Sequence, residues 1–347
     1  MEAYAPVRLR QEVMDEGLCP LCGGCAGACP YLGQYRGRIV QLDCCTLVDG
    51  SCYQWCPRTY TDVDALSQSL FGVPFGESEL GVVRESVLAR STDERTRERE
   101  SGGGVVSALL GVALDEGMID AAIVTGESSD ERADGLLERN VASGLSRTQG
   151  LTGLLARSKE QVVTSMEAGL ATARVLPTLN SVPKEASERY GIVSLPCQVA
   201  SLAKRRMLPP EGRVSMDNVK VVVGLFCATK RQLEPGESRE ETNRACSYCW
   251  DLTAEFADIS VGSGRAKFKD WNTVLARSDT GAKLLELARA KGVLESQALP
   301  TESLAVEQKA SLNKKRRAAK NLVEKTGDRR NLLYWGMREE VAEALLG

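Results

Sequence analysis

The sequence predicts a mixed α/β (α+β) fold, in which a mixed sheet with helices follows a small cysteine-rich unit. Short apolar runs that suit buried strands alternate with amphipathic stretches that suit helices, which favours a layered structure. Gly and Pro residues separate these runs from one another. Strands are expected at 119–125, 191–195, 219–226 and 257–261, and helices at 105–116, after Cys197, and in two pieces between 301 and 346.

The cysteine-rich unit defines the expected domain organisation. Eight of the twelve cysteines lie between Cys19 and Cys56, in a stretch with few apolar residues for a core of its own. The run 72–81 has the Gly, Pro and Ser content of a linker. We therefore expect a ferredoxin-like domain over 1–72, a linker over 73–82 and an α/β domain over 83–347.

The residue composition excludes several kinds of chemistry. The chain has no histidine, which rules out Ser-His-Asp and Cys-His hydrolases, His-ligated zinc or haem, and Rieske clusters. A net charge of -3 argues against a nucleic-acid partner. Met1 is followed by no apolar signal stretch, and no run of ~18 apolar residues is present to cross a membrane. We expect a cytoplasmic protein whose clustered cysteines bind metal rather than form disulfides.

The first four cysteines follow the bacterial ferredoxin pattern C-x2-C-x2-C-x3-C-P. They are Cys19, Cys22, Cys25 and Cys29, the last of which precedes Pro30. In this pattern three thiolates bind one [4Fe-4S] cluster and the fourth belongs to a second cluster. Intervening glycines let the backbone pass close to the cluster sulfurs. A structural zinc site is the alternative, but a second set of cysteines downstream favours iron and sulfur.

The second set repeats the end of this pattern, C-x3-C-P, but not its beginning. Its members are Cys44, Cys45, Cys52 and Cys56, the last before Pro57. The regular pattern would have cysteines where this chain has Thr46 and Asp49. By ferredoxin logic, Cys56 would join Cys19, Cys22 and Cys25, whereas Cys29 would join Cys52 and one or both of Cys44 and Cys45. Two [4Fe-4S] clusters are expected; the alternative is one cluster plus a site that an oxygen ligand such as Asp49 completes or that stays incomplete.

The last four cysteines each follow a predicted strand or lie in a turn. They are Cys197, Cys227, Cys246 and Cys249. Strand ends at one edge of a sheet converge in space, so these thiols could hold a third cubane. Alternatively, Cys197 and Cys227 are ordinary buried cysteines, which behave as small hydrophobes. The spacing favours neither alternative.

Several ordered blocks of the sequence resemble the beta subunits of coenzyme F420-reducing hydrogenases and dehydrogenases. The blocks are ESGGGVVSAL at 100–109, DEGMID at 115–120, LPCQ at 195–198, GLFC at 224–227, CSYC at 246–249 and ADISVG at 257–262. The resemblance covers roughly residues 83 to 320. The segment before it resembles the N-terminal extension of the longer members of that family.

This resemblance implies an oxidoreductase with FAD lodged beside a [4Fe-4S] cluster. By position, the last four cysteines would bind that cluster, and the residues in contact with FAD would be Ser101, Gly102, Gly103, Gly104 and Ser107. A glycine-rich turn that opens a helix also offers N–H groups to a pyrophosphate. The family moves electrons between coenzyme F420 and iron-sulfur carriers, so we expect partner subunits of the hydrogenase, formate dehydrogenase or heterodisulfide-reductase type.

The expected reaction requires no catalytic side chain, because the flavin itself carries the hydride. Electrons would then pass through three [4Fe-4S] clusters to or from the partner complex. Ser194 stands where the family usually has glycine, which leaves NAD(P)H or another hydride donor as an alternative. A metal-stabilised interaction subunit without redox turnover is the alternative from another class. The basic run at 314–317 is interpreted as a solvated helix surface, or as a patch for the coenzyme's acidic tail or an acidic partner.

Overall fold

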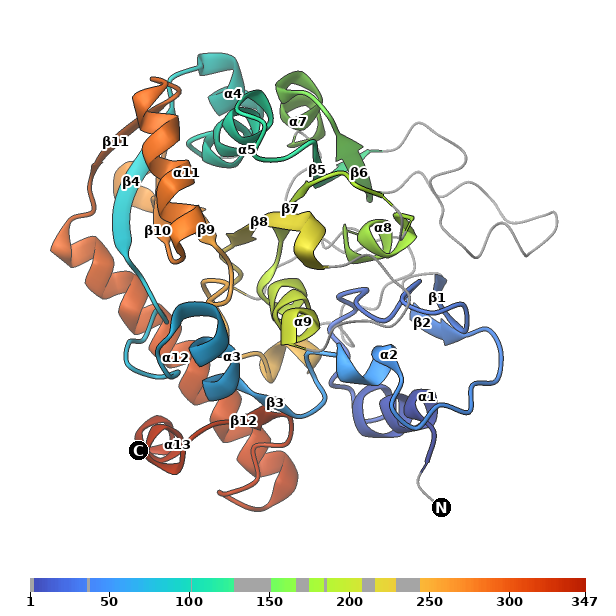
Figure 1. Ribbon diagram of the computed structural model, residues 1–347. Helices are drawn as coiled ribbons and strands as arrows, with labels where there is room; N and C mark the ends of the chain where they lie inside the picture. The colour runs from blue at the N-terminus through green and yellow to red at the C-terminus, as the bar shows by residue number, and fades with distance from the viewer. Residues whose placement is uncertain are drawn as a thin grey trace.

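The computed structural model describes residues 3–35, 38–100, 102–127, 151–166, 175–183, 186–207, 216–228 and 244–347. Within them, a central eight-stranded sheet has the strand order β11-β4-β10-β9-β8-β7-β5-β6 (Figure 1). Its strands are β4 (Glu85–Ser91), β5 (Ala121–Glu127), β6 (Leu151–Ala156), β7 (Tyr190–Ser194), β8 (Val219–Leu225), β9 (Ile259–Ser263), β10 (Asn272–Ala276) and β11 (Leu294–Ala298). The predicted mixed α/β fold is confirmed.

Five strands of this sheet run in one direction. β5, β7, β8 and β9 are parallel neighbours. β10 is antiparallel to both β9 and β4, so β4 runs the same way as β9. β6 and β11 are antiparallel strands at the two edges. The carboxyl ends of β4, β5, β7, β8 and β9 therefore lie along the same side of the sheet, which we call its carboxyl edge. Open α/β sheets bind ligands on this side.

Helices cover both faces of the sheet (Figure 1). One face carries α4 (Glu94–Arg99), α5 (Val105–Asp115), α7 (Lys159–Met166) and α11 (Asp279–Ala290), and the other carries α3 (Val63–Phe71), α8 (Val175–Ser181), α9 (Pro196–Met207) and α12 (Thr301–Thr326). The alternation along β5 explains these two layers. Ala122 and Val124 pack under α5, whereas Ala121 and Ile123 point to the opposite core. None of the described helices combines the length and apolarity needed to cross a bilayer.

The N-terminal segment folds around its cysteines. It contains α1 (Ala5–Leu9), the π-helical turn η1 (Arg10–Met14), the antiparallel pair β1 (Leu32–Tyr35) and β2 (Arg38–Gln41), and α2 (Ser51–Gln54). Leu9, Val13 and Leu18 form a small apolar cluster, to which Cys25 and Cys52 contribute. The segment lies against α8 and α9 (Figure 1). Thiols therefore make up part of the core that this short stretch lacks in aliphatic residues.

The C-terminal segment returns to the N-terminal one. After α12, β12 (Trp335–Gly336) pairs in parallel with β3 (Thr61–Asp62), and α13 (Glu339–Leu346) follows. Val63 and Phe75 belong to the same apolar cluster as Trp250. The expected linker over 73–82 is anchored, because Arg277 Nη1 donates to the carbonyls of Leu80 and Val82 at 2.7 and 2.8 Å. The domain limits at 72 and 83 stay a prediction.

Candidate functional site

Four thiols form what we name the first cysteine group: Cys19, Cys22, Cys25 and Cys56. They line one small cavity together with apolar side chains that include Leu9 and Val13. Burial, and then the neighbouring thiols Cys19 and Cys56, raise the pKa of Cys25 well above its ordinary value. Burial also raises the pKa of Cys19 to about 12 and that of Cys22 to about 11. The structure thus brings Cys56 to the three cysteines that the ferredoxin pattern pairs with it; their binding of iron stays a prediction.

The glycines of this loop serve packing against the α/β sheet's helices. A Cβ on Gly24 would lie 2.5 Å from Ser201 Oγ on α9, and one on Gly23 would lie 2.6 Å from Pro177 Cδ on α8. Gly23 also has a φ of +77°, which side chains rarely adopt. The sequence suggested that these glycines make room for cluster sulfurs. In the structure they let the loop approach α8 and α9.

The second cysteine group comprises Cys29, Cys45 and Cys52. Burial raises the pKa of Cys52 to about 12, and the nearby Cys29 and Cys45 add to the shift. Cys44 is exposed, and its N–H donates to Asp43 Oδ1 at 2.7 Å. The two adjacent cysteines therefore differ in their surroundings, as expected for neighbours whose side chains point apart.

The third cysteine group comprises Cys197, Cys227, Cys246 and Cys249. Cys197 lies in the first turn of α9 just after β7, and Cys227 follows β8, so both come from the carboxyl edge of the sheet. Burial raises the pKa of Cys197 well above its ordinary value, and the thiols of Cys22, Cys249, Cys227 and Cys246 act in the same direction. The structure therefore brings all four together.

The three groups form a series. Cys22 of the first group is a neighbour of Cys197 of the third, and Cys25 of the first is a neighbour of Cys52 of the second. None of the twelve cysteines, all of which the structure describes, forms a disulfide bond. Among the described residues, no three Cys, Asp or Glu side chains are placed to share a single metal ion. Convergent thiols that form no disulfide are the donor set that iron-sulfur clusters require, so the residues present fit that cofactor.

Buried cations surround the first and third groups. Lys204 Nζ donates to the carbonyl of Cys56 at 2.8 Å, and Arg205 Nη2 donates to the carbonyl of Gly24 at 2.8 Å. Lys314 Nζ donates to the carbonyls of Cys227 and Asp251 at 2.6 and 2.7 Å. Such donors hold the cysteine loops in place and balance the negative charge that thiolates carry.

These cations affect the thiols unequally. Burial opposes ionisation of Cys249, but the positive charges of Lys314 and Arg58 outweigh it and lower the pKa of that thiol. Burial likewise opposes the charge on Lys314, but Cys249 and Cys227 outweigh it and raise the pKa of the lysine. The pKa of Cys249 is thus lower than that of an ordinary cysteine, which favours the thiolate form needed for a metal ligand.

The basic run at 314–317 is only partly a solvated surface. Arg316 and Arg317 are exposed as expected, whereas Lys314 and Lys315 are buried. The expectation of a solvated face is wrong for these two lysines, because they lie on the inward face of α12. That face consists of Ser311, Lys314, Lys315, Ala318, Ala319 and Leu322, whose spacing is that of one helical stripe.

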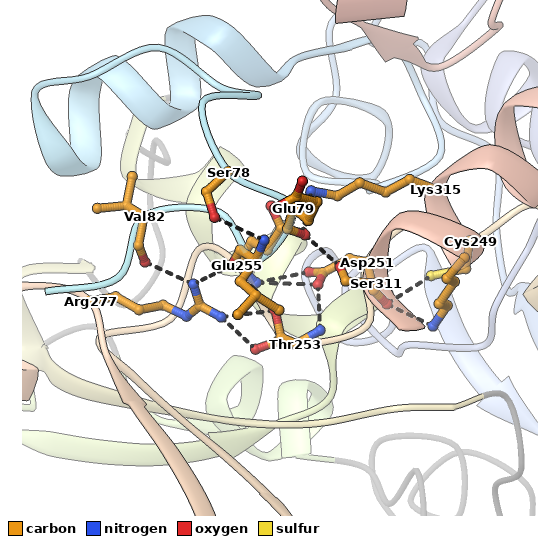
Figure 2. Close-up of polar contacts among 12 residues, drawn as sticks. Ser78, Glu79, Val82, Cys249, Asp251, Thr253, Glu255, Arg277, Ser311 and Lys315 are labelled. Atoms are coloured by element: carbon orange, nitrogen blue, oxygen red, sulfur yellow. Dashed lines mark hydrogen bonds and ion pairs between the residues drawn. The ribbon is translucent and has the colours of Figure 1, made fainter. Parts of the chain in front are cut away.

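A buried network fixes the loop that follows Cys249 (Figure 2). The Asp251 carboxylate accepts the N–H groups of Thr253 and Glu255 at 3.0 and 3.1 Å. Lys315 Nζ lies 2.8 Å from Glu255 Oε1, and Arg277 Nη2 donates to Thr253 Oγ1 at 2.8 Å. Burial raises the pKa of Glu255 to about 7, although Lys315 acts against the shift. The network joins α12 and β10 to the third group's loop.

The glycine turn lies after β4, at the sheet edge that also carries Cys197 and Cys227. Gly104 begins α5, and the Gly103 N–H donates to Asn272 Oδ1 at 2.8 Å. The Glu100 carboxylate accepts the N–H groups of Val106 and Ser107 at 3.2 and 3.1 Å. Burial raises the pKa of Glu100. An internal carboxylate therefore occupies the position at this helix end that the sequence suggested for a phosphate.

The predicted FAD contacts are described only in part. Ser101 lies outside the described residues, whereas Gly102, Gly103, Gly104 and Ser107 are placed at the start of α5. A Cβ on Gly103 would lie 2.7 Å from Asn272 Oδ1 and 3.0 Å from the Ala89 carbonyl. Close packing against β4 and β10 thus requires glycine here whatever the turn binds. The roles of these residues toward FAD stay a prediction.

Comparison with known proteins identifies the family of this chain. Residues 86–141 match the family described as "Coenzyme F420 hydrogenase/dehydrogenase, beta subunit N-term", and residues 228–302 match its C-terminal counterpart. The chain belongs to the coenzyme F420 hydrogenase/dehydrogenase beta subunit family. The resemblance noted in the sequence is thereby confirmed, and the chain is an oxidoreductase of that family.

Individual relatives span most of the chain. Coenzyme F420 hydrogenase subunit beta of Methanothermobacter thermautotrophicus is 26% identical over 284 residues, which cover 70% of this chain and 95% of the relative. Coenzyme F420-dependent sulfite reductase of Methanocaldococcus jannaschii is 23% identical over 330 residues; the match covers 81% of this chain but about half, 47%, of that protein. A chain of the F420-reducing [NiFe] hydrogenase complex from Methanosarcina barkeri has the same fold, with a TM-score of 0.56, 23% identity, and coverage of 75% of this chain and 97% of its own.

Sequence reasoning missed the residues that surround the cysteines. Lys204, Arg205 and Glu100 are not among the site residues that the sequence predicts. Their burial depends on segments far away in the chain, so sequence alone gave little signal. For the lysines of α12 a signal existed, because their spacing from Ser311 and Ala318 follows the helical period.

Proposed function

We propose that this protein is an electron-transfer subunit that moves electrons between coenzyme F420 and a partner redox complex by way of FAD and three [4Fe-4S] clusters. Its family and its F420-linked relatives support electron transfer in an F420-linked complex. The partner would be other subunits of a hydrogenase, formate dehydrogenase or heterodisulfide-reductase type of complex.

The observation that carries the proposal is the series of cysteine groups. The third group adjoins the sheet edge, the first adjoins the third through Cys22 and Cys197, and the second adjoins the first through Cys25 and Cys52. Each would hold one cluster. Electrons would enter at the third cluster and leave at the second, beside the exposed Cys44, or travel the opposite way.

The protein's own residues would bind, position and shield these groups. Ligand thiols must be deprotonated, and the buried Arg58, Lys204 and Lys314 favour that form or balance its charge. Burial of Cys22, Cys25 and Cys56 in the first group would keep water from its cluster. FAD, when bound, would convert a two-electron hydride into single electrons that clusters can carry.

FAD is proposed to lie at the carboxyl edge of the sheet, against Ser101, Gly102, Gly103, Gly104 and Ser107. This placement is supported by the family and by the position of the turn against β4 and β10, at the sheet edge where the parallel strands end. Because Glu100 already caps α5, these glycines would contribute backbone shape and their remaining N–H groups rather than the N–H groups of Val106 and Ser107.

The test is anaerobic purification followed by mixing with a hydride donor. We expect flavin absorption bands, a broad shoulder near ~400 nm, and about twelve irons per chain, four for each of three clusters. Reduced coenzyme F420 should bleach the flavin faster than NADPH or NADH does. A colourless zinc-containing protein would refute redox function and support a metal-stabilised interaction subunit. Bleaching by NAD(P)H alone would show that NAD(P)H, rather than coenzyme F420, is the hydride carrier.

A further inference from the structure

We propose that Arg58 is a positioning residue that couples the first and third cysteine groups, holding their loops together and placing one buried positive charge between the two clusters. The inference rests on the proposed function, because it assumes that both groups hold clusters. It adds that a single side chain sets the reduction potentials of both.

The contacts of Arg58 reach both groups. Its backbone N–H donates to Cys56 Sγ at 3.4 Å, in the first group. Its Nη1 donates to the carbonyl of Tyr248 at 3.3 Å, within the turn that carries Cys246 and Cys249. Arg58 therefore links the Cys56 loop to Tyr248, which lies 190 residues after Arg58 in the sequence.

Tyr334 holds the guanidinium in this position. The Arg58 guanidinium lies 4.5 Å from the centroid of the Tyr334 ring and donates to its hydroxyl. The same hydroxyl donates to the Tyr248 carbonyl at 2.6 Å. The planar fork of arginine suits this combination of stacking and hydrogen bonding, which a lysine would reproduce only in charge.

The charge of Arg58 has no carboxylate partner among the described residues, although the residue is only 4% exposed. Its Nε is buried and has no hydrogen-bond partner among them either. A buried, unpaired charge is strongly unfavourable, so a counter-charge is needed. Clusters bound by four thiolates carry net negative charge, and those of the first and third groups would lie on either side of the guanidinium.

Other cations act on one group only, which gives the proposal its controls. Arg205 binds the Gly24 carbonyl in the loop of the first group and stacks on Trp55 with its Cζ 4.4 Å from the ring centroid. Lys314 binds the Cys227 carbonyl of the third group. Each cation should raise the potential of the clusters it adjoins, because positive charge favours the more negative, reduced state.

The experiment is an anaerobic redox titration of the full, iron-loaded protein, followed by electron paramagnetic resonance. In Arg58→Gln, both the first and the third cluster should be harder to reduce. We expect the ratio of reduced to oxidised cluster at a fixed potential to fall about tenfold, which is about 59 mV for a one-electron couple. Arg205→Gln should change only the first cluster, and Lys314→Gln only the third. Signals are assigned with Cys22→Ser and Cys197→Ser.

The outcomes separate the proposal from its premise. Unchanged potentials in Arg58→Gln, or a change in only one cluster, would overturn the coupling role while leaving the electron-transfer function intact. Wild-type protein without iron would instead overturn the proposed function. If Arg58→Gln does not accumulate, Arg58→Lys decides the question, because it retains charge: both potentials should stay within about 18 mV of wild type, a twofold ratio, and a larger shift of either would refute the role assigned to the charge.

Discussion

The buried pair between Lys315 on α12 and Glu255 makes a strong prediction about stability. The two side chains are 3% and 1% exposed and lie 2.8 Å apart. In Lys315→Met, Glu255 keeps its burial but loses its cation, and loss of one partner of a buried pair costs about 3–5 kcal/mol. Unfolding entropy of ~2.1 cal/mol/K per residue over 347 residues gives about 1.4 °C per kcal/mol, so the apparent Tm should fall by about 4–7 °C.

The loss should also depend on pH. The pKa of Glu255 rises from 4.5 in the unfolded chain to about 7 in the fold, chiefly through burial, so the folded state holds its proton more tightly. Stability from this group is complete below pH 4.5 and falls as the pH rises to 7, by about 3 kcal/mol. Removal of Lys315 raises this pKa further. Relative to wild type, Lys315→Met should therefore lose the most stability at pH 8, and about 1 kcal/mol or less of it at pH 5.

The assay is anaerobic thermal unfolding at one scan rate, at pH 5 and pH 8. Lys309→Met is the matched control, because it makes the same chemical change on an exposed part of the same helix and should stay within about 0.5 kcal/mol of wild type. Adding Glu255→Gln to Lys315→Met should recover part of the loss at pH 8, since the unpaired charge disappears. Equal Tm values for the Lys315 and Lys309 variants, or equal losses at both pH values, would refute this account.

Three further predictions concern the cysteine groups and the glycine turn. Cys197→Ser should lower the iron content from about twelve to about eight per chain while the first group's cluster keeps its spectrum, and full iron retention would count against the third site. Glu100→Ala leaves two helix N–H groups uncapped and should cost about 1–3 kcal/mol in urea unfolding, whereas the exposed Glu98→Ala should cost little; equal effects would contradict the cap. Gly24→Ala should cost about 1–3 kcal/mol through its clash with Ser201, and Ser201→Gly should restore most of it; no rescue would place the strain elsewhere.

The sequence was informative wherever a local pattern decided the structure. Strands expected at 191–195 and 219–226 are β7 and β8, nearly to the residue, because each is a short apolar run bounded by turn residues. β11 was not predicted, since its residues Leu294–Ala298 are mostly polar and exposed at the sheet edge. An edge strand of this kind depends on its partner β4 rather than on its own pattern.

For the candidate site, too, the sequence was informative only where a local pattern decided the structure. The spacing of Cys19, Cys22 and Cys25 identified the loop, because ferredoxin-type ligands are local in sequence. The partners of these cysteines were not predictable, since Arg58 and Tyr334 meet only after the chain has folded. Glu100 was also missed, because a charged residue in a run of charges gives no sign that it will cap a helix.

The pairing of Thr61–Asp62 with Trp335–Gly336 has a consequence for how the protein matures. Tyr334, which precedes that short strand, touches both Arg58 and the turn at Tyr248. The scaffold around the first and third groups is therefore incomplete on the ribosome until residue 335 has been synthesised and has left the exit tunnel. Insertion of iron at the junction of these two groups would then wait until the segment around Tyr334 has folded onto Arg58, even though most of the thiols involved emerge long before.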